Sequence, residues 1–492
     1  MSTEGRRHIH GVDYERAGEG YMGKRQLQAG AAGWVLLAGL GVAYVISGDF
    51  AGWNFGLAEG GWGGLLIATI LMAIMYTCMV LGLAEMSSAL PVAGAGYGFA
   101  RRALGPLGGF ATGTAILIEY AIAPAAIVIF IGGYIESLDI FGIESGWPVY
   151  LACYVVFVGI HLYGVGEALK LMFGITAIAV IALIVFVIAM IPEFDSSNLT
   201  DIAPDTSKAG ASDFIPFGYA GVLSAFVYGI WFFLAIEGVP LAAEETRDPK
   251  RDLPRGIIAG MVVLLFFAAL ILLTAPGGGG ADAIQGSDNP LPEALGIAYG
   301  ENAFVTDFVN YVGLAGLIAS FFSIIYAYSR QLYALSRAGY LPRSLSVTSG
   351  RRTPHVALIV PAIVGFLTAS IYAESSTPAE AGARMIQIAV FGATVSYVLM
   401  TASHIVLRYR EPELERPYRT PGGVVTTGVA LVLAMAAVVA VFFVDETAAL
   451  IVAGIFALFV AYFWFYSRHR LVADAPEEEF EAIERAEAEL AG

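Results

Sequence analysis

Long apolar segments are the feature that most constrains this sequence. Twelve of them alternate with polar loops, and a membrane-spanning helix needs about 20 such residues. Of the 492 residues, 58% are hydrophobic and 14% are charged, which a soluble core of this size does not require. We therefore predict an all-α integral membrane protein with twelve transmembrane helices. The segments are 30–57, 63–88, 107–137, 147–163, 170–192, 214–244, 256–275, 303–333, 355–373, 384–407, 424–444 and 447–467.

The distribution of basic residues predicts the orientation of these helices. If the N-terminus is cytoplasmic, 24 of the 26 Lys and Arg residues fall on the cytoplasmic side, and only Lys208 and Arg384 fall outside. We expect a multi-pass protein of the plasma membrane with both termini in the cytoplasm. Residues 1–28 lack the pattern of a signal peptide. Eight acids between Asp474 and Glu489 predict a solvated C-terminal tail.

The first apolar segment is interrupted by polar and flexible residues. Val45–Trp53 reads VISGDFAGW, and Ser47, Gly48 and Asp49 lie in the middle of the segment. An ionised Asp in hydrocarbon costs at least about 2.5 kcal/mol, and Gly weakens a helix. A membrane helix tolerates both where it breaks around a polar cavity. Asp49 is either part of a transport site or an N-cap of the second half of the helix.

The sixth segment repeats the interruption. Trp231–Pro240 reads WFFLAIEGVP, in which Glu237, Gly238 and Pro240 favour a break. The two interruptions lie five helices apart, each at the start of a possible five-helix unit. Matched breaks of this kind indicate an inverted-repeat transporter with discontinuous helices 1 and 6 and a site near the midplane. Glu237, like Asp49, has helix capping as its alternative role.

Two further acids lie in apolar surroundings. Glu119 is expected near the middle of the third segment, with Tyr120 beside it. Glu119 is a candidate for binding a cation or a proton, and a structural hydrogen bond to another helix is the alternative. Glu85 lies at the cytoplasmic end of the second segment, where we interpret it as a packing or inner-gate residue.

Motifs typical of enzymes and of metal sites are missing from the sequence. There is no HExxH motif, no supported GxSxG motif and no Cys/His cluster, so we predict no enzymatic activity, no metal site and no cofactor. Cys78 and Cys153 fall in apolar segments and form no disulfide framework. The glycine run Gly277–Gly280 predicts a flexible surface loop or an outer gate. Apart from the lipid bilayer, we expect a small molecule and no nucleic acid as partner.

Several motifs resemble the amino acid–polyamine–organocation superfamily. ISGDF is similar to the break in helix 1 of that superfamily, and the other stretches are similar to its loops and helix junctions. Within the superfamily, Gly48–Gly64 and Gly113–Leu138 resemble the ethanolamine permease group. The stretches that carry the resemblance are Ile46–Phe50, Leu83–Pro106, Ile236–Gly256, Ser329–Leu345, Thr353–Leu358 and Leu407–Gly423.

The resemblance implies a twelve-helix fold with a five-plus-five inverted repeat, two extra helices, and uptake of a small amine. It divides the chain into two tails, two repeats and a final helix pair: 1–28, 29–193, 214–408, 424–467 and 468–492. The sequence departs from amino acid carriers of the superfamily at the helix 1 break, where Ile46 replaces a Gly and Asp49 replaces an apolar residue. Ala179 stands where some proton-coupled members carry a lysine.

An acid in the break favours a cationic substrate. A carboxylate near Asp49 would be repelled by about 4 kcal/mol at 4 Å for a dielectric of 20, whereas an ammonium would be attracted equally. We hypothesise that the amine of ethanolamine, or of a similar small amine, meets Asp49 or Glu237. Aromatic rings at the break would cover the site, although ordinary packing is the alternative role of each ring. The candidate substrate-binding residues are Ser47, Gly48, Asp49, Phe50, Glu119, Tyr120, Trp231, Phe232 and Glu237.

Coupling to an ion leaves two routes open. A proton would use Glu119 or Glu237, whereas sodium would use Ser320 and Ser323, unless these serines bond their own backbone. We thus predict a secondary active transporter that imports a small primary amine by alternating access. The alternatives are a permease for a zwitterionic or cationic amino acid, or an amine exchanger or uniporter.

Overall fold

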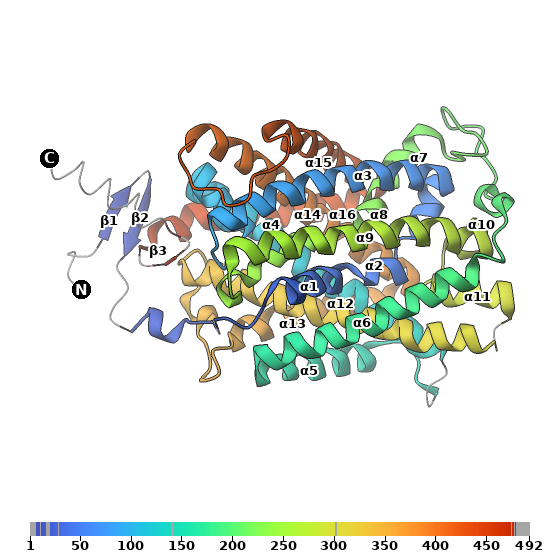
Figure 1. Cartoon of the computed structure of the whole chain (residues 1–492), viewed down its shortest axis with the longest axis horizontal. Helices are drawn as coiled ribbons and strands as arrows, with labels where there is room; N and C mark the ends of the chain where they lie inside the picture. Colours follow the sequence, from blue (N-terminus) through green and yellow to red (C-terminus); the bar gives the residue numbers. More distant parts are fainter. Residues whose placement is uncertain are drawn as a thin grey trace.

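Helices make up most of the computed structural model (Figure 1). The structure describes residues 6–9, 11–15, 20–27, 29–138, 142–300, 303–473, 475, 476 and 478. The helices of the first half are α1 (Trp34–Val45), α2 (Ser47–Phe50), α3 (Phe55–Ala89), α4 (Gly96–Ser137), α5 (Trp147–Tyr163) and α6 (Val165–Met190). Short 3₁₀ turns are η1 (Met22–Lys24), η3 (Ser196–Thr200), η4 (Ile236–Glu245), η5 (Arg343–Ser346) and η6 (Ser467–His469).

The second half of the chain contains the remaining helices. They are α7 (Gly218–Ser224), α8 (Phe226–Trp231), α9 (Pro249–Gly279), α10 (Ala281–Ile284), α11 (Pro290–Tyr299), α12 (Phe304–Arg337), α13 (His355–Ser375), α14 (Pro378–Arg410), α15 (Val424–Val444) and α16 (Glu446–Phe465). In the described part of the chain, ten helical segments are long and apolar enough to cross a membrane. Two shorter apolar segments, 34–50 and 147–163, accompany them.

The helices pack around α4, which lies along α14 and α12 in the interior of the bundle. Helix α1 lies against α9 and also contacts α12. The close approach of α1 and α9 depends on small residues, because a side-chain carbon added at Gly256 would lie 2.5 Å from Cβ of Leu37. The outer surface is apolar, with side chains such as Val155 and Ile371 more than 60% exposed. An apolar surface of this kind suits a lipid environment.

A three-stranded sheet lies beyond one end of the bundle, which we call the sheet end (Figure 1). Strand β1 (Arg6–Ile9) pairs antiparallel with β2 (Val12–Glu15), and β2 pairs parallel with β3 (Leu471–Val472). Helices α10 and α11 lie at the opposite end, the far end (Figure 1). Both terminal segments thus contribute to one folded unit.

The C-terminal segment differs from the predicted solvated tail at one acid. The Glu478 side chain is buried, and its carboxylate lies 2.7 Å from the Arg101 guanidinium. The expectation of a solvated acid is therefore wrong at Glu478. The other seven acids between Asp474 and Glu489 lie outside the described residues.

The glycine run predicted as a loop is helical instead. Gly277–Gly279 complete α9, and only Gly280 turns the chain, at φ 87°. Side-chain carbons added at Gly277 and Gly278 would lie 2.3 Å from the Phe194 ring and 2.4 Å from Met190. These glycines therefore allow Met190 and Phe194 to pack closely against α9, and the prediction of a flexible surface loop is wrong at Gly277–Gly279.

Irregular backbone occurs at both predicted interruptions. Between α2 and α3, Ala51 is extended and Gly52 has φ 92°. In the second half, Ala235 adopts a left-handed conformation (φ 78°) between α8 and η4. An L-residue other than Gly rarely adopts this conformation, so packing must hold Ala235 there.

Candidate functional site

The stretch Ser47–Phe50 is held against α12 through the hydroxyl of Ser320. The Ser47 backbone N–H donates to Ser320 Oγ at 2.9 Å, and that hydroxyl donates to the Ala43 carbonyl at 2.7 Å. Ser320 therefore bridges the end of α1 and the start of α2. Ser323 donates to the carbonyl of Ser320 at 3.0 Å, a bond within its own helix. Of the two candidate serines, only Ser320 contacts the interruption.

Asp49 is buried without a partner. Its side chain is 1% exposed, and neither carboxylate oxygen forms a hydrogen bond within the described part of the chain. The N-cap position of α3 belongs to Asn54, whose Oδ1 accepts from the Gly52 N–H at 3.1 Å. Asp49 therefore does not cap α3. A buried carboxylate with no donor is destabilising unless a proton or a cation neutralises it.

The candidate aromatic residues pack around this stretch. Trp231 Nε1 donates to the Ala51 carbonyl at 2.9 Å, and the Phe232 ring stacks on Trp53 with centroids 5.6 Å apart. A side-chain carbon at Gly48 would lie 2.5 Å from the Trp231 carbonyl oxygen, so glycine is required for this contact. A side-chain carbon added at Gly316 of α12 would lie 2.2 Å from the Phe50 ring. The two interrupted segments thus meet face to face.

Glu237 lies at the centre of a second group of side chains. Tyr120 donates to Glu237 Oε1 at 2.8 Å, and Tyr397 of α14 donates to Oε2 at 3.3 Å. Tyr76 of α3 donates to the Tyr397 hydroxyl at 2.7 Å. All four side chains are at most 3% exposed. We call Glu119, Glu237, Tyr76, Tyr120 and Tyr397 the carboxyl cluster.

Glu119 is the unusual member of this cluster. It is fully buried, and neither of its oxygens has a hydrogen-bond donor among the described residues. The group beside it is the carboxyl of Glu237, and the two can bond to each other only when one holds a proton. The cluster therefore contains two acids that cannot both be ionised and unpaired in a low-dielectric interior.

The predicted site residues thus form two groups. Ser47, Gly48, Phe50, Trp231, Phe232 and Ser320 lie together at the interruptions, whereas Glu119, Tyr120 and Glu237 lie in the carboxyl cluster. No hydrogen bond or ion pair joins Asp49 to the cluster within the described chain. Tyr76 and Tyr397 were not predicted as site residues, because the sequence around a tyrosine in an apolar segment does not indicate which residue its hydroxyl bonds. No set of three metal-ligating side chains occurs among the described residues.

Ion pairs close the sheet end of the bundle. Glu245 and Arg330 are both fully buried, and their side chains meet at 2.9 Å, joining η4 to α12. Tyr326 donates a further hydrogen bond to Glu245. One residue earlier, Glu244 pairs with Arg337. A buried ion pair in this position fixes η4, and with it Glu237, to α12.

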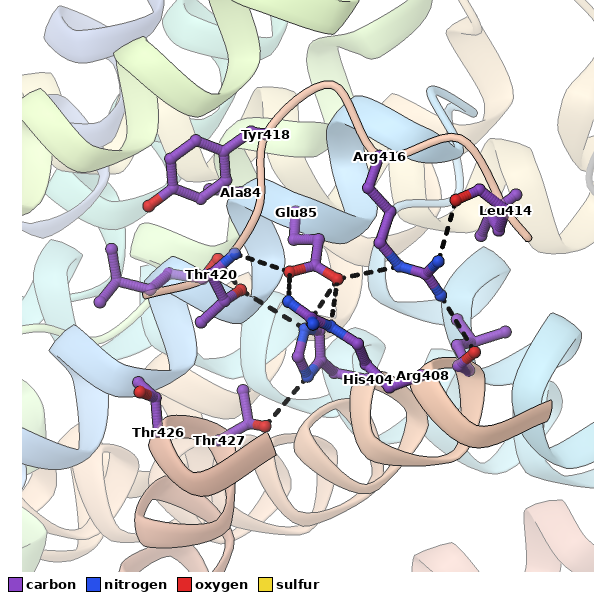
Figure 2. Close-up of polar contacts among 12 residues, drawn as sticks. Ala84, Glu85, His404, Arg408, Leu414, Arg416, Tyr418, Thr420, Thr426 and Thr427 are labelled. Carbon is purple, nitrogen blue, oxygen red and sulfur yellow. Dashed lines mark hydrogen bonds and ion pairs between the residues drawn. The ribbon is translucent and has the colours of Figure 1, made fainter. Parts of the chain in front are cut away.

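Glu85 forms a separate cluster with side chains of α14 and of the connection that follows it (Figure 2). Its carboxylate lies 2.5 Å from Arg408, 3.0 Å from Arg416 and 3.3 Å from His404. The backbone N–H of Thr420 donates to it at 2.7 Å. One carboxylate on α3 thereby holds α14 and the connection from Glu411 to Gly423. This fits the predicted packing role of Glu85.

A cavity of about 480 Å³ opens at the far end of the bundle. Its lining includes Glu59, Tyr228, Arg384, Gln387 and Asp445. Gln387 lies on α14, which also carries Tyr397 ten residues later, about 15 Å further along the helix. The cavity and the carboxyl cluster therefore share one helix.

Comparison with known proteins places this arrangement among transporters. The chain is 28% identical to an uncharacterised transporter of Rhizobium meliloti over 410 residues, covering 82% of this chain and 84% of the relative. It is 27% identical to a branched-chain amino acid permease of Bacillus subtilis over 395 residues, covering 76% and 79%. A probable GABA permease of Pseudomonas aeruginosa is 26% identical over 348 residues, covering 67% and 69%.

The family model described as amino acid permease matches residues 34–471, which is nearly the whole chain. The match extends from the start of α1 to β3 and includes both interruptions, the carboxyl cluster and the ion pairs at the sheet end. Proteins of this family are multi-pass membrane transporters and not enzymes. The chain belongs to the amino acid permease family.

Proposed function

We propose that the protein is a secondary active transporter that imports a small primary amine, with ethanolamine as the preferred substrate. The observation that carries the proposal is the carboxyl cluster, in which Glu119 has no hydrogen-bond donor among the described residues and Glu237 accepts from Tyr120 and Tyr397. Two neighbouring carboxylates repel each other by about 4 kcal/mol at 4 Å for a dielectric of 20. A single ammonium group between them replaces this repulsion with two attractions.

A proton serves the same purpose when the substrate is absent. One proton shared by Glu119 and Glu237 neutralises half of the pair and allows a hydrogen bond between them. When the substrate enters, one carboxyl of the pair holds the proton while the other binds the ammonium, so the two cations cross together and an inward proton gradient drives amine uptake. Sodium is less well supported, because Ser320 already bonds Ala43 and Ser47, and Ser323 bonds its own helix.

The hydroxyl of ethanolamine needs a partner near the cluster. Tyr44 on α1 is buried, and its hydroxyl has no hydrogen bond among the described residues. Its ring lies 3.2 Å from the position of a side-chain carbon at Gly238, the residue after Glu237. We assign Tyr44 to the hydroxyl end of the substrate. Asp49, unpaired as well, would attract the cation on its way to the cluster.

The proposed architecture is two five-helix repeats, 29–193 and 214–408, followed by two helices in 424–467. The ten long spans and the two shorter apolar segments would make twelve crossings, with discontinuous helices at Ser47–Phe50 and before Glu237. The protein would lie in the plasma membrane. Its tails, 1–28 and 468–492, and with them the sheet end of the bundle, would lie in the cytoplasm. Substrate would then enter through the cavity at the far end, which faces outward.

Transport of a zwitterionic amino acid is the second candidate. It is favoured by the relatives, which include a branched-chain amino acid permease and a probable GABA permease. A substrate carboxylate would need donors that are not acids. Asp49 in the interruption and two acids in the cluster argue against a carboxylate there.

The experiment is uptake of labelled ethanolamine into proteoliposomes, with and without an inward proton gradient. We expect concentrative uptake that ethanolamine displaces better than leucine or GABA. Glu119→Gln should retain the fold and lose gradient dependence, whereas Tyr311→Phe, on the exposed surface of α12, is the matched control. Uptake of leucine but not of ethanolamine would refute the substrate assignment. Gradient-dependent uptake in Glu119→Gln would refute the shared-proton mechanism.

A further inference from the structure

An open groove of about 450 Å³ lies where α1 begins. Pro254, Arg255, Ile258 and Ala259 of α9 form one wall, and their spacing places them on one face of the helix. Trp34, the first residue of α1, forms a second wall. The lining is almost entirely apolar apart from the Arg255 side chain. The groove thus has an apolar body and one cation.

The third wall of the groove is Tyr418. Figure 2 shows the Tyr418 ring pointing away from Glu85. The backbone N–H of Thr420, two residues later on the same connection, donates a hydrogen bond to Glu85. The Tyr418 backbone N–H also donates to Ser88 Oγ at 3.2 Å. The connection that carries Tyr418 is therefore held in place, and the groove is a built feature of the fold.

Arg255 differs from the other basic residues at the start of α9. Lys250 pairs with Glu415 at 3.3 Å, and Arg251 lies 4.0 Å from Asp248. Arg247 donates to the Gly30 carbonyl at 3.3 Å. Arg255 is exposed and forms no hydrogen bond or ion pair within the described part of the chain. Its charge is available to a ligand in the groove.

We propose that this groove binds an anionic phospholipid, with the phosphate at Arg255 and an acyl chain along Trp34, Ile258 and Tyr418. Trp and Tyr rings favour the level of the lipid headgroups, where one end of the ring is apolar and the other is hydrated. A basic residue at this level attracts anionic headgroups. The pairing of an unpartnered cation with an apolar groove matches the two parts of such a lipid. The bound chain would touch the first residue of α1, the helix that leads to Ser47–Phe50.

Binding of short-chain phosphatidylglycerol to the purified full-length protein, measured by native mass spectrometry, tests the proposal. We expect saturable binding that is about fivefold tighter than that of phosphatidylcholine with the same chains. Arg255→Gln should remove this preference. Arg251→Gln, which removes the same charge from the same helix, should preserve it. Trp34→Ala should weaken both lipids equally.

Three results would overturn the proposal. Equal loss of preference in Arg255→Gln and Arg251→Gln would show diffuse attraction in place of a site. Competition by glycerol phosphate as strong as by the lipid would show a site for a soluble anion. Unchanged binding of both lipids in Trp34→Ala would place the acyl chain elsewhere. None of these readouts depends on amine transport, so the lipid site and the proposed function can fail separately.

Discussion

Glu478 and Arg101 form a buried ion pair at 2.7 Å that joins the C-terminal segment to the start of α4. Tyr14 of β2 and Tyr97 of α4 also donate to the Glu478 carboxylate, at 3.2 Å and 3.3 Å. This acid is one of several attachments of the sheet to the bundle, beside the Arg343–Glu15 ion pair and the hydrogen bond from the Val472 N–H to the Ala338 carbonyl. Because Arg101 is itself almost fully buried, the charge of each partner depends on the other.

Replacing Glu478 should therefore loosen the docking of the sheet. Glu478→Gln leaves the Arg101 guanidinium buried without a countercharge, and breaking such a pair costs about 3–5 kcal/mol. We expect faster hydrogen exchange in Val12–Glu15 and Leu471–Val472, with the bundle unaffected. Glu413→Gln, at an exposed position, is the control. Exchange in the sheet that matches the wild type would show that the pair does not hold it.

The sequence could not predict this attachment. Strands of four and two residues carry little periodic signal, and the acid that docks them lies within a run that reads as solvated. The same is true of Gly277–Gly279, whose composition suggests a linker although close packing against Phe194 and Met190 makes it helical. Local composition indicates the secondary structure that a segment prefers in isolation. In these two segments, tertiary contacts determine the structure instead.

The apolar segments and the interruptions were predictable because their signals are local. Length and hydropathy define a span, and Gly or Pro beside an acid marks irregular backbone. The partners of Glu237 were not predictable, since Tyr76 and Tyr397 lie far from it in sequence. Asp49 and Glu119 could be named as buried acids, but only the structure separates Asp49 from the carboxyl cluster.

The sheet should also respond to acid. His469 and His8 donate to the Asp13 carboxylate at 2.8 Å and 2.7 Å, and these bonds lower the pKa of Asp13 below its ordinary value of 3.8. The released sheet then binds the proton more readily than the docked one, so docking is strongest above about pH 4 and weakens as the pH falls through the lowered pKa. Amide exchange in Val12–Glu15, corrected for intrinsic rates, measures this. Asp13→Asn should remove the dependence, and an identical pH profile in that variant would contradict the assignment.

The Glu85 cluster predicts a large stability effect from a single charge. Glu85→Gln removes the countercharge of Arg408 and Arg416 and weakens the contact that holds Thr420. We expect a loss of about 3–5 kcal/mol, seen as a lower unfolding temperature in detergent. Glu413→Gln on the same connection should be neutral within about 0.5 kcal/mol. Equal unfolding temperatures in the two variants would show that the cluster is weakly coupled to stability.

The Glu245–Arg330 pair makes the sharpest prediction for the sheet end. Glu245→Gln leaves Arg330 without a countercharge in a fully buried position, and the most direct relief is hydration, which requires η4 to move away from α12. We expect faster hydrogen exchange in Ile236–Glu245 without global unfolding. Glu244→Gln is the comparison variant on the same element, because Glu244 is 24% exposed whereas Glu245 is fully buried; its partner Arg337 also donates to the Tyr333 hydroxyl, a bond that this variant keeps.

A double variant separates opening from local damage at the same pair. Glu245→Gln combined with Arg330→Gln removes both charges, so the drive for hydration disappears and exchange in η4 should return toward the wild-type rate. If the double variant exchanges as fast as Glu245→Gln alone, the loss of hydrogen bonds and not the uncompensated charge opens this end. If Glu244→Gln opens it equally, the effect belongs to η4 as a whole, and the buried pair has no special role in closure.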